Sequence, residues 1–597
     1  MRIGVAALAL LALAATSHAA CGGDFHVGPD GDDARDGRTA ATAWRTVQHA
    51  ADVLTAGQTV CVHPGTYRER VTVRHSGTAG KPITFRGDGA TLDGGDRPSG
   101  AWTRTPDDVV PGAGGRVWQR ELGYAPAHCT WRGQYVVAMD SPRTDWKKAL
   151  VDGPLTDPSA QGRTPAARFG WQFADAVFHV EGPTTFVRFA DGHAPGPADD
   201  LSFCPADTGT FSTGGQSWIA VTGFTIQGCE NAVRVPGGAH VVVRGNTLRH
   251  GRRTVQCAGC AASTFEDNDV TLAYGRDLAA SAPDHWGVWQ VFRVNGSYPR
   301  MAFDVGGAGS ADNVVAGNRV HDCFDGISDW DGTDLKPEEY GNNARFTVRD
   351  NVVSRCANDA FMAREGGQDA RWYDNRALDV NVGFRLRVYA GPTWIYRNLV
   401  YAADGPALDG AFAYVWQGFP GRVHLYHNSA STRRGVVWGK AVGLPPGLNA
   451  RDGAPHLFVW DNVFSAVTPV EFWARDWNAP GVPRPSWRYN WHANGTGRQM
   501  WMDDTNVIGD GRRLWPPNAP PTFVLPPGST ARGAAAPVTA PDAATFRPWP
   551  GFDAPAGAER AAAGTPRRLD MGAVQGDGRP ADRADGARPA AGARAGT

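Results

Sequence analysis

After its first 20 residues, the chain lacks any run long and apolar enough to cross a bilayer. It has no HExxH pair of metal-binding histidines and no glycine-rich phosphate loop after a strand, so nothing supports a zinc peptidase or a P-loop enzyme. The formal net charge of −1 provides no overall field to attract nucleic acid or an anionic membrane. We therefore expect no nucleic-acid partner and no later membrane span.

Residues 1–20, MRIGVAALALLALAATSHAA, have a charged start, an apolar core and small residues at the end. This pattern is typical of a cleaved signal peptide, not of a membrane span. The following SHAAC matches a lipoprotein box poorly, so we expect no lipid at Cys21. The sequence therefore predicts an exported, soluble protein, secreted or periplasmic, that acts as a monomer.

The composition favours turns and flat aromatic rings. With 75 glycines and 43 prolines among 597 residues, the chain is not expected to be helical. Its 22 tryptophans suit stacking against sugars, although they can equally fill a core.

Nine cysteines in an exported chain predict disulfides with one cysteine left over. Their positions along the chain suggest pairing of Cys21 with Cys61 and of Cys129 with Cys204. CAGC at 257–260 has no second CxxC, so we expect a local disulfide or structural thiols there and not zinc.

From residue 240 onward, an asparagine recurs after short alternating stretches such as VVVRGNTL and FTVRDNVV. The base spacing is near 22–24 residues, with longer insertions, which is typical of a solenoid whose loops grow on one side. We expect each asparagine to adopt a left-handed turn conformation and to hydrogen-bond to its copies in adjacent coils. The copies are Asn246, Asn268, Asn318, Asn351, Asn375, Asn398, Asn428 and Asn462.

Apolar residues surround these asparagines in a fixed phase. Positions five and three before the asparagine are mostly apolar, as in Val241 and Val243, and the position two after it is apolar again. Alternation of this kind predicts a strand with one face in the core. Coils of this length with several short strands predict a parallel β-helix.

The N-terminal region predicts a helical cap for the open end of such a solenoid. Thr42 is placed to cap a helix with Trp44, Val47, Ala51 and Leu54 on one face. Such a helix can cover a hydrophobic core that would otherwise be open to water.

Three stretches of this region, GPDGDDARDGRTAATAWRTVQHA, GQTVCVHPGTYRERV and SGTAGKPITFRG, closely resemble secreted bacterial proteins of the pectate-lyase-like class. With the asparagine repeats, the resemblance covers most of 22–500, and LDMGAVQGDG looks like the closing segment of that class. It implies an all-β, right-handed parallel β-helix that acts on carbohydrate. These motifs are more specific for the fold than for an activity.

The repeat also divides the chain. Residues 99–217 break the period with strand-like stretches of a small inserted domain, and an insertion over about 271–312 accounts for the 50-residue gap after Asn268. The predicted parts are a signal peptide (1–20), an N-terminal cap with the first coils (21–98), an inserted β-rich domain (99–217), a parallel β-helix (218–500), C-terminal coils or cap (501–578) and a disordered tail (579–597).

Charges crowd three adjacent coils. Cys323 and Cys356 each lie five residues after a repeat asparagine, so we expect neighbouring rungs and a disulfide or a cysteine stack. Aligning the next strands, DGISDWDG, DAFMAREG and VGFRLRVY, places Asp325 near Asp359. The same alignment places Asp331 near Glu365. It predicts one column of Trp330, Arg364 and Arg387, and an inward-facing column of Ile327, Phe361 and Phe384. A further column, Ser328, Met362 and Arg385, is expected to face outward.

Two carboxylates on adjacent rungs push one pKa upward, which yields an acid and a base in one cleft. Glycoside hydrolysis needs that pair. The leading hypothesis is therefore a glycoside hydrolase with Asp325 and Asp359 as the catalytic pair and Glu365 as a substitute for either, without a cofactor. We expect substrate contacts, with an acidic sugar favoured by the arginines, from Asp331, Trp330, Arg364, Arg385, Arg387, Tyr396 and Trp394.

Polygalacturonases are similar in kind, with stacked aspartates and a basic R-x-K-like pair further along the chain. Asp325, Asp359 and Arg385-x-Arg387 are the matching positions here. However, Asn358-Asp359 replaces a doubled aspartate, and no His-Gly motif is present, so that family is not assigned.

Two other functions stay open. A polysaccharide lyase would use an arginine, His321 or Tyr389 as base, with Ca²⁺ held by the aspartates. A non-catalytic solenoid would bind glycan through outward aromatics such as Trp394 and Tyr396. As a purely structural alternative, Asp325 and Asp359 cap turns at strand starts.

Overall fold

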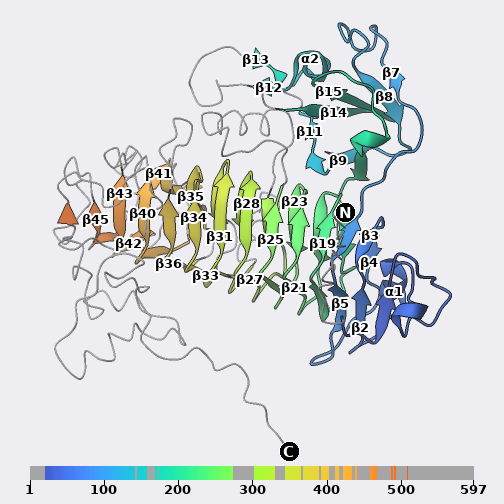
Figure 1. The fold of residues 1–597 in the computed structure, drawn as a ribbon. Coiled ribbons are helices and arrows are strands. Elements are labelled where there is room, and N and C mark those ends of the chain that lie inside the picture. The colour runs from blue at the N-terminus through green and yellow to red at the C-terminus, as the bar shows by residue number, and fades with distance from the viewer. Residues whose placement is uncertain are drawn as a thin grey trace, which may run out of the picture.

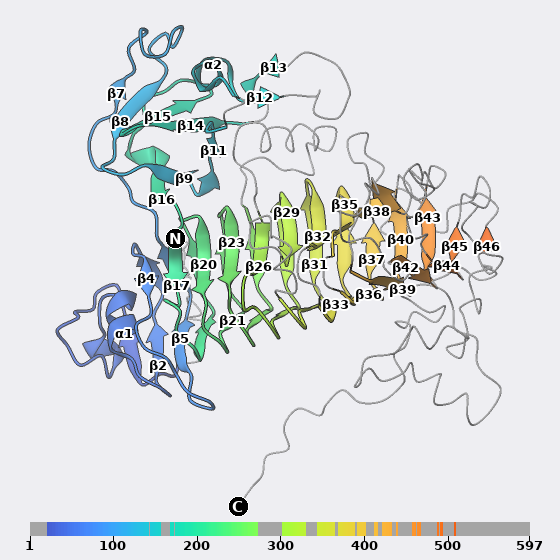
Figure 2. The ribbon, with the colours of Figure 1, turned by 180° about the vertical axis from the view of Figure 1, so that it is seen from behind.

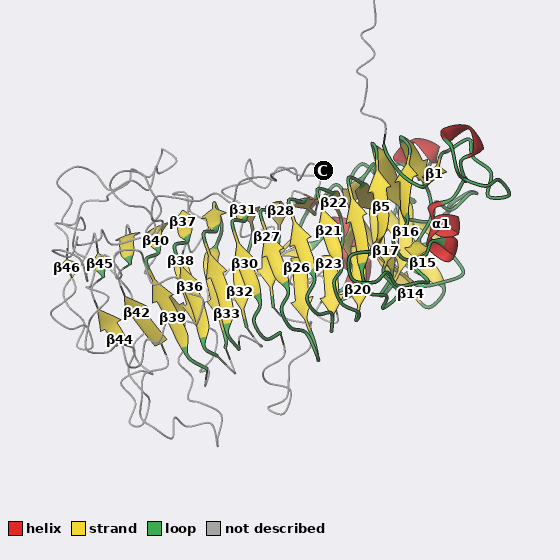
Figure 3. Ribbon diagram, turned by 90° about the horizontal axis from the view of Figure 1, so that it is seen from below, coloured by secondary structure: helices red, strands yellow, loops and turns green. Residues whose placement is uncertain are grey.

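The computed structural model of the protein describes residues 21–141, 144–156, 168–171, 174–272, 301–329, 343–364, 368–388, 391–401, 411–415, 421–432, 437–439, 457–460, 462–466, 486–488, 490–492 and 507–508. In these parts the chain is almost entirely β-structure (Figure 3). The predicted signal peptide (1–20), the tail predicted to be disordered (579–597) and most of 501–578 lie outside them. Among the described residues, no helix is long and apolar enough to span a membrane.

Three long sheets of parallel strands wind along one axis (Figure 1). Each coil runs from sheet 1 through sheet 2 to sheet 3, and each strand pairs in parallel with the same strand of the next coil, as in β18, β21 and β24. This arrangement confirms the predicted all-β parallel solenoid.

Sheet 1 consists of β1 (Phe25–Val27), β2 (Thr59–Val62), β5 (Ile83–Gly87), β18 (Ile219–Thr222), β21 (Val242–Arg244), β24 (Thr264–Glu266), β27 (Val314–Ala316), β30 (Thr347–Arg349), β33 (Ala370–Tyr373), β36 (Thr393–Tyr396), β39 (Val423–Tyr426), β42 (Leu457–Trp460) and β44 (Ser486–Arg488). Sheet 2 consists of β3 (Gly65–Tyr67), β6 (Ala90–Asp93), β19 (Thr225–Gln227), β22 (Thr247–Arg249), β25 (Asp269–Thr271), β28 (Arg319–Cys323), β31 (Val352–Cys356), β34 (Arg376–Leu378), β37 (Leu399–Tyr401), β40 (Ser429–Thr432), β43 (Val463–Ala466), β45 (Trp491–His492) and β46 (Val507–Ile508). Sheet 3, in front in Figure 2, consists of β4 (Val71–Thr72), β17 (Gly209–Ser212), β20 (Asn231–Pro236), β23 (Arg253–Ala258), β26 (Met301–Gly306), β29 (Asp325–Ser328), β32 (Asp359–Ala363), β35 (Val382–Leu386), β38 (Ala411–Val415) and β41 (Val437–Gly439).

The core is built from columns of identical position in successive coils. Val315, Val348, Trp372 and Ile395 pair in register along sheet 1, three residues before their asparagines, and all four side chains are buried. The predicted phase of the repeat is therefore confirmed. Burying such columns is the main favourable contribution to the folding of a solenoid.

The repeat asparagines form a continuous hydrogen-bonded ladder between sheets 1 and 2. Each side-chain amide donates to the side-chain oxygen of the next asparagine at 2.9–3.1 Å, from Asn246 as far as Asn490. The predicted bonding between copies is confirmed, but the predicted backbone conformation is wrong. From Asn246 to Asn428, the residue before each repeat asparagine takes the left-handed conformation, as Asp350 does with φ of 56°. The asparagine can therefore stay extended and aim its side chain along the ladder.

Asn351→Ala should lower the free energy of unfolding by about 2–3 kcal/mol, because it leaves buried polar groups without partners. Asn351 donates to Val315 O at 2.9 Å and accepts from the backbone and side-chain nitrogens of Asn318 at 2.9 and 3.0 Å. Urea denaturation measures the loss, with Arg349→Ala on the half-exposed surface of the same coil as control. Equal losses in both variants would contradict the structural role of the ladder.

Helix α1 (Val47–Val53) covers the first coil, where its buried residues Val47, Ala50 and Ala51 join the solenoid core (Figure 1). The predicted cap residue is wrong. Thr42 ends a short 3-10 turn (Ala40–Thr42), and the side chain of Thr46 accepts the hydrogen bond from His49 N that begins the helix. The helical cap over the first coil is found as predicted.

Disulfides join Cys21 to Cys61, Cys257 to Cys260, and Cys323 to Cys356, as the sequence predicts. The pairing of Cys129 with Cys204 is wrong. Cys204 bonds to Cys229 in the solenoid, and Cys129 is a buried free thiol. Cys129 and Cys204 do lie in adjacent strands, but Cys129 pairs in register with Phe203, and Cys204 with His128.

A small domain interrupts the coil between β6 and β17 and stands above the first coils in Figure 1. Arg97 anchors its start, bonding to Asp93 at 2.7 Å and to Asp200 at 2.6 Å. Its elements are β7 (Thr103–Arg104), β8 (Trp118–Glu121), β9 (Pro126–Trp131), β10 (Gln134–Tyr135), β11 (Val137–Ala138), α2 (Trp146–Asp152), β12 (Leu155–Thr156), β13 (Arg168–Phe169), β14 (Ala176–Glu181), β15 (Thr184–Phe189), a 3-10 turn (Pro197–Asp199) and β16 (Ser202–Pro205).

Candidate functional site

Asp325 and Asp359 are the first residues of β29 and β32, which are neighbouring strands of sheet 3, and both side chains are completely buried. The pairing of Ile327 with Phe361 and of Ser328 with Met362 reproduces the register expected from the sequence. Gly326 lets the two coils approach closely, because a Cβ atom there would lie 2.2 Å from Ala360 O. The fold therefore brings the two acids together on adjacent rungs.

Asn358 bridges the two carboxyl groups. Its side-chain nitrogen donates to Asp325 Oδ1 at 2.8 Å and to Asp359 Oδ2 at 3.1 Å. The backbone N–H of Asp359 donates a further bond to Asp325 Oδ1 at 3.2 Å. In the sequence, Asn358 stood out only as a departure from a doubled aspartate; the structure makes it the link between both acids.

Arg385, on β35 of the next coil, pairs with the second acid. Its Nε donates to Asp359 Oδ2, and its guanidinium lies 5.3 Å from the ring centre of Tyr414. A nearby arginine stabilises the ionised form of a carboxyl group. Asp359 is thus the member of the pair that is placed to carry the negative charge.

Each carboxyl group has one oxygen engaged and one unengaged. Asp325 Oδ1 accepts two hydrogen bonds and Asp359 Oδ2 accepts bonds from Asn358 and Arg385. Asp325 Oδ2 and Asp359 Oδ1 are buried and have no hydrogen-bond partner in the part of the chain that the structure describes. An unengaged buried oxygen is costly to maintain and is typical of a site that awaits a ligand or a proton.

Burial raises the pKa of Asp325 to about 7, and the neighbouring Asp359 adds to this rise. Burial also raises the pKa of Asp359, while the Arg385 and Arg364 guanidinium groups oppose the rise. Because the arginines act more directly on Asp359, the pair is expected to hold its shared proton on Asp325. Oδ2 is the oxygen of Asp325 that is free to carry it.

Two further acids, one in sheet 3 and one just after a strand of it, were missed from the sequence. Asp304 on β26 is buried one coil before Ser328, with Arg253 Nε 3.0 Å from its Oδ2. Asp329, just after β29, accepts a bond from Arg364 N at 2.7 Å. The signal for Asp304 was a charge in the middle of the buried strand MAFDVG.

The predicted binding residues fall into three groups. Arg364 and Arg387 lie opposite each other on the coils of Asp359 and Arg385, since Arg387 N bonds to Ala363 O at 2.9 Å. Trp394 and Tyr396 belong to sheet 1 and are not brought to the carboxyl pair. The predicted binding residues Trp330 and Asp331 and the predicted substitute acid Glu365 lie outside the described residues.

On sheet 1 these aromatics stack on one another. Tyr373, Tyr396 and Tyr426 form one column with ring centres 5.0 and 4.9 Å apart. Trp394 stacks on His424 at 4.2 Å in a second column. Both Trp394 and Tyr396 are buried, so their rings serve packing in this structure and are not exposed as a binding surface.

His321 lies on sheet 2, between two carboxylates. Its Nε2 is 3.0 Å from Asp269 and its Nδ1 is 2.6 Å from Asp322, which Arg355 also binds at 2.7 Å. The hydrogen bond with Asp322 is the main cause of a raised pKa for His321. A histidine held in its charged form is a poor base for a lyase.

The His321 cluster should make stability depend on pH. Because the folded pKa of His321 is raised above its usual value of 6.5, its contribution is fully present below that pH and is lost as pH rises through the folded pKa. His321→Gln should remove this part of the pH dependence in urea denaturation between pH 6 and 9. An unchanged slope would contradict the assignment.

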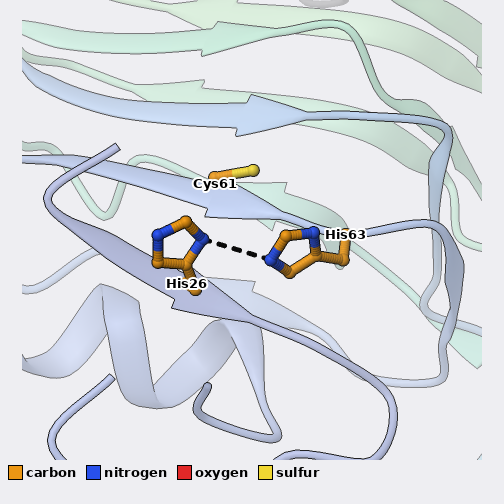
Figure 4. A group of neighbouring side chains, drawn as sticks. All are labelled: His26, Cys61 and His63. Carbon is orange, nitrogen blue, oxygen red and sulfur yellow. Dashed lines mark hydrogen bonds between the residues drawn. The ribbon is translucent and has the colours of Figure 1, made fainter. Parts of the chain in front are cut away.

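Among the described residues, one group of histidine, cysteine or acidic side chains could hold a metal ion, because its ligand atoms lie within 4.8 Å of one another. It consists of His26, Cys61 and His63 (Figure 4). They lie at the N-terminal end of the solenoid, on β1, on β2 and just after β2. The group is separate from the carboxyl pair, which starts β29 and β32.

A family model described as right handed beta helix region matches residues 210–400. The protein is a right-handed parallel β-helix. A 65-residue stretch is 49% identical to the uncharacterized protein YwoF of Bacillus subtilis (strain 168). That stretch is 11% of this chain and 14% of YwoF, so the chain matches only a small part of that relative's length.

Several solved structures are similar to this chain at low sequence identity. The complex of XylC with xylose is 15% identical, with a TM-score of 0.49 over 82% of this chain and 86% of that chain. Pectate lyase Pel9A is 12% identical, with a TM-score of 0.37 over 86% and 91% of the two chains. The GH136 lacto-N-biosidase from Eubacterium ramulus is 11% identical, with a TM-score of 0.36 over 81% and 67%.

Proposed function

We propose that this β-helix is an exported glycoside hydrolase whose catalytic groups are Asp325 and Asp359. The observation that carries the proposal is the difference in environment between the two carboxyl groups. Among the described residues, each acid is held by one oxygen and leaves the other unengaged, and Asp359 is the one of the two that is paired with an arginine. Glycoside hydrolysis requires this combination of a protonated acid beside an ionised carboxylate.

In the proposed reaction, Asp325 Oδ2 donates its proton to the oxygen of the leaving sugar. Asp359 Oδ1 attacks the sugar or removes a proton from the attacking water, and Arg385 stabilises its negative charge. Asn358 keeps the two carboxyl groups at a fixed separation by donating to both. No cofactor enters these steps.

The substrate class is a polysaccharide, and an acidic one is favoured. Arg364 and Arg387 lie opposite each other on the coils of Asp359 and Arg385, both buried as the acid pair is, and Arg253 lies further along the same sheet. Guanidinium groups bind sugar carboxylates in a bidentate way. A uronate-containing glycan is therefore the first substrate to test.

Mass spectrometry of products tests the proposal against its two alternatives. The purified protein is incubated with a panel of neutral and uronate-containing polysaccharides, with and without Ca²⁺. Products that have gained one water establish hydrolysis. Products with an unsaturated end, one water lighter, establish a lyase, and glycan binding without any products establishes a binding solenoid; either result overturns the proposal.

A further inference from the structure

The outer face of the first two coils gathers two histidines and a disulfide at a site remote from the carboxyl pair. His26 on β1 pairs directly with Cys61 on β2. His63 lies two residues after Cys61, and alternate residues of a strand share a face, so Cys61 and His63 point the same way. Figure 4 shows the two rings turned toward each other with Cys61 alongside.

The spacing of these atoms suits a tetrahedral metal ion. His26 Nδ1 and His63 Nε2 are 3.1 Å apart. Two imidazole nitrogens on one tetrahedral Zn²⁺ stand about 3.3 Å apart, because each Zn–N bond is about 2.0 Å long. The sulfur of Cys61 lies within 4.8 Å of one ring nitrogen of each histidine, and Cys21 is bonded to that sulfur.

We propose that His26, His63, Cys61 and Cys21 form a zinc site that replaces the Cys21–Cys61 disulfide when that bond is open. A dithiol reductant supplies two electrons to the S–S bond, which opens to two thiols with uptake of two protons. Zn²⁺ then displaces those protons and binds the two thiolates and two neutral imidazoles, a Cys₂His₂ ligand set that is common in structural zinc sites.

The alternative is an ordinary hydrogen bond, in which one neutral imidazole donates to the other. It accounts for the 3.1 Å contact without involving Cys61, whose sulfur is held by the disulfide. The metal and the disulfide would each tie residue 21 to β2. The same four side chains could thus close the N-terminal end under both oxidising and reducing conditions.

A Cys21→Ser variant tests the site without reductant, because it frees the Cys61 thiol and leaves the other disulfides intact. With Co²⁺ as the probe, we expect one bound ion per chain and a thiolate-to-cobalt charge-transfer band. Adding His63→Ala should weaken binding at least about tenfold, since one of three ligands is lost. Cys260→Ser, which frees Cys257 in the core, is the matched control and should show neither signal.

Peptide mapping of the wild-type protein gives a second, independent readout. After mild reduction, Zn²⁺ should protect Cys21 and Cys61 from alkylation by iodoacetamide but should not protect Cys204 and Cys229. Equal alkylation with and without Zn²⁺ would overturn the proposal. So would Co²⁺ binding by Cys21→Ser that does not depend on His63.

Discussion

Replacing Asp325 with asparagine is expected to lower the rate of glycan hydrolysis by about 10²–10⁴-fold while the protein stays folded. Asparagine keeps an oxygen that can accept the bonds from Asn358 and from Asp359 N. It cannot deliver a proton to the leaving sugar. The loss should therefore fall on turnover, with little change in substrate affinity.

The pH profile ties this loss to one proton. Since burial raises the pKa of Asp325 to about 7, wild-type activity should fall as pH rises through that value. Asp312→Asn is a matched control, because Asp312 forms a half-exposed pair with Arg345 on the same solenoid. Full activity of Asp325→Asn, or an equal loss in Asp312→Asn, would refute the assigned role.

Replacing Arg385 with methionine is expected to destabilise the protein by about 3–5 kcal/mol at neutral pH, because a buried carboxylate loses its cation. Asp359 is completely buried, and the Arg385 side chain is only 11% exposed. Without the arginine, the pKa of Asp359 should rise further above its ordinary value. Hydrolysis should also fall, since the variant lacks the ionised carboxylate.

The sign of the pH dependence distinguishes this effect from a simple packing loss. A raised folded pKa means that the folded state binds the proton more tightly than the unfolded state, so the destabilisation grows as pH rises and shrinks toward pH 4. Urea denaturation of Arg385→Met at both ends of this range measures it. Arg345→Met, at a half-exposed pair, should cost less than about 1 kcal/mol, and the same loss at both pH values in Arg385→Met would contradict the assignment.

The periodic part of the fold could be predicted because its residues repeat. The offset from each asparagine placed Cys323 beside Cys356, and the alignment of the strands that follow placed Asp325 near Asp359; the structure shows both registers. The partner of Cys204 could not be found in this way, since the inserted domain has no repeat from which to count. Its partner, Cys229, is a neighbour in space that no periodicity connects to it.

The site was predictable in outline but not in detail. Trp394 and Tyr396 precede their asparagine, whereas Asp325 follows its own by seven residues, so the offsets already placed them on different sheets. The bridge through Asn358 depends on side-chain directions at a bend, which a strand pattern does not specify. The pairing of Arg385 with Asp359 likewise depends on the length and rotamer of the arginine side chain, which the sequence pattern does not specify.

The asparagine ladder also determines where this protein can change. From β18–β19 to β44–β45, each described connection between sheets 1 and 2 is two residues long. The long insertions, such as 273–300 and 402–410, instead enter between sheets 2 and 3, and 330–342 enters between sheet 3 and the next coil. The border between sheets 1 and 2 therefore keeps a constant length, whereas both borders of sheet 3, which carries the acid pair, can accept new sequence. Loop exchange at those borders is the natural route to altered specificity on an unchanged scaffold.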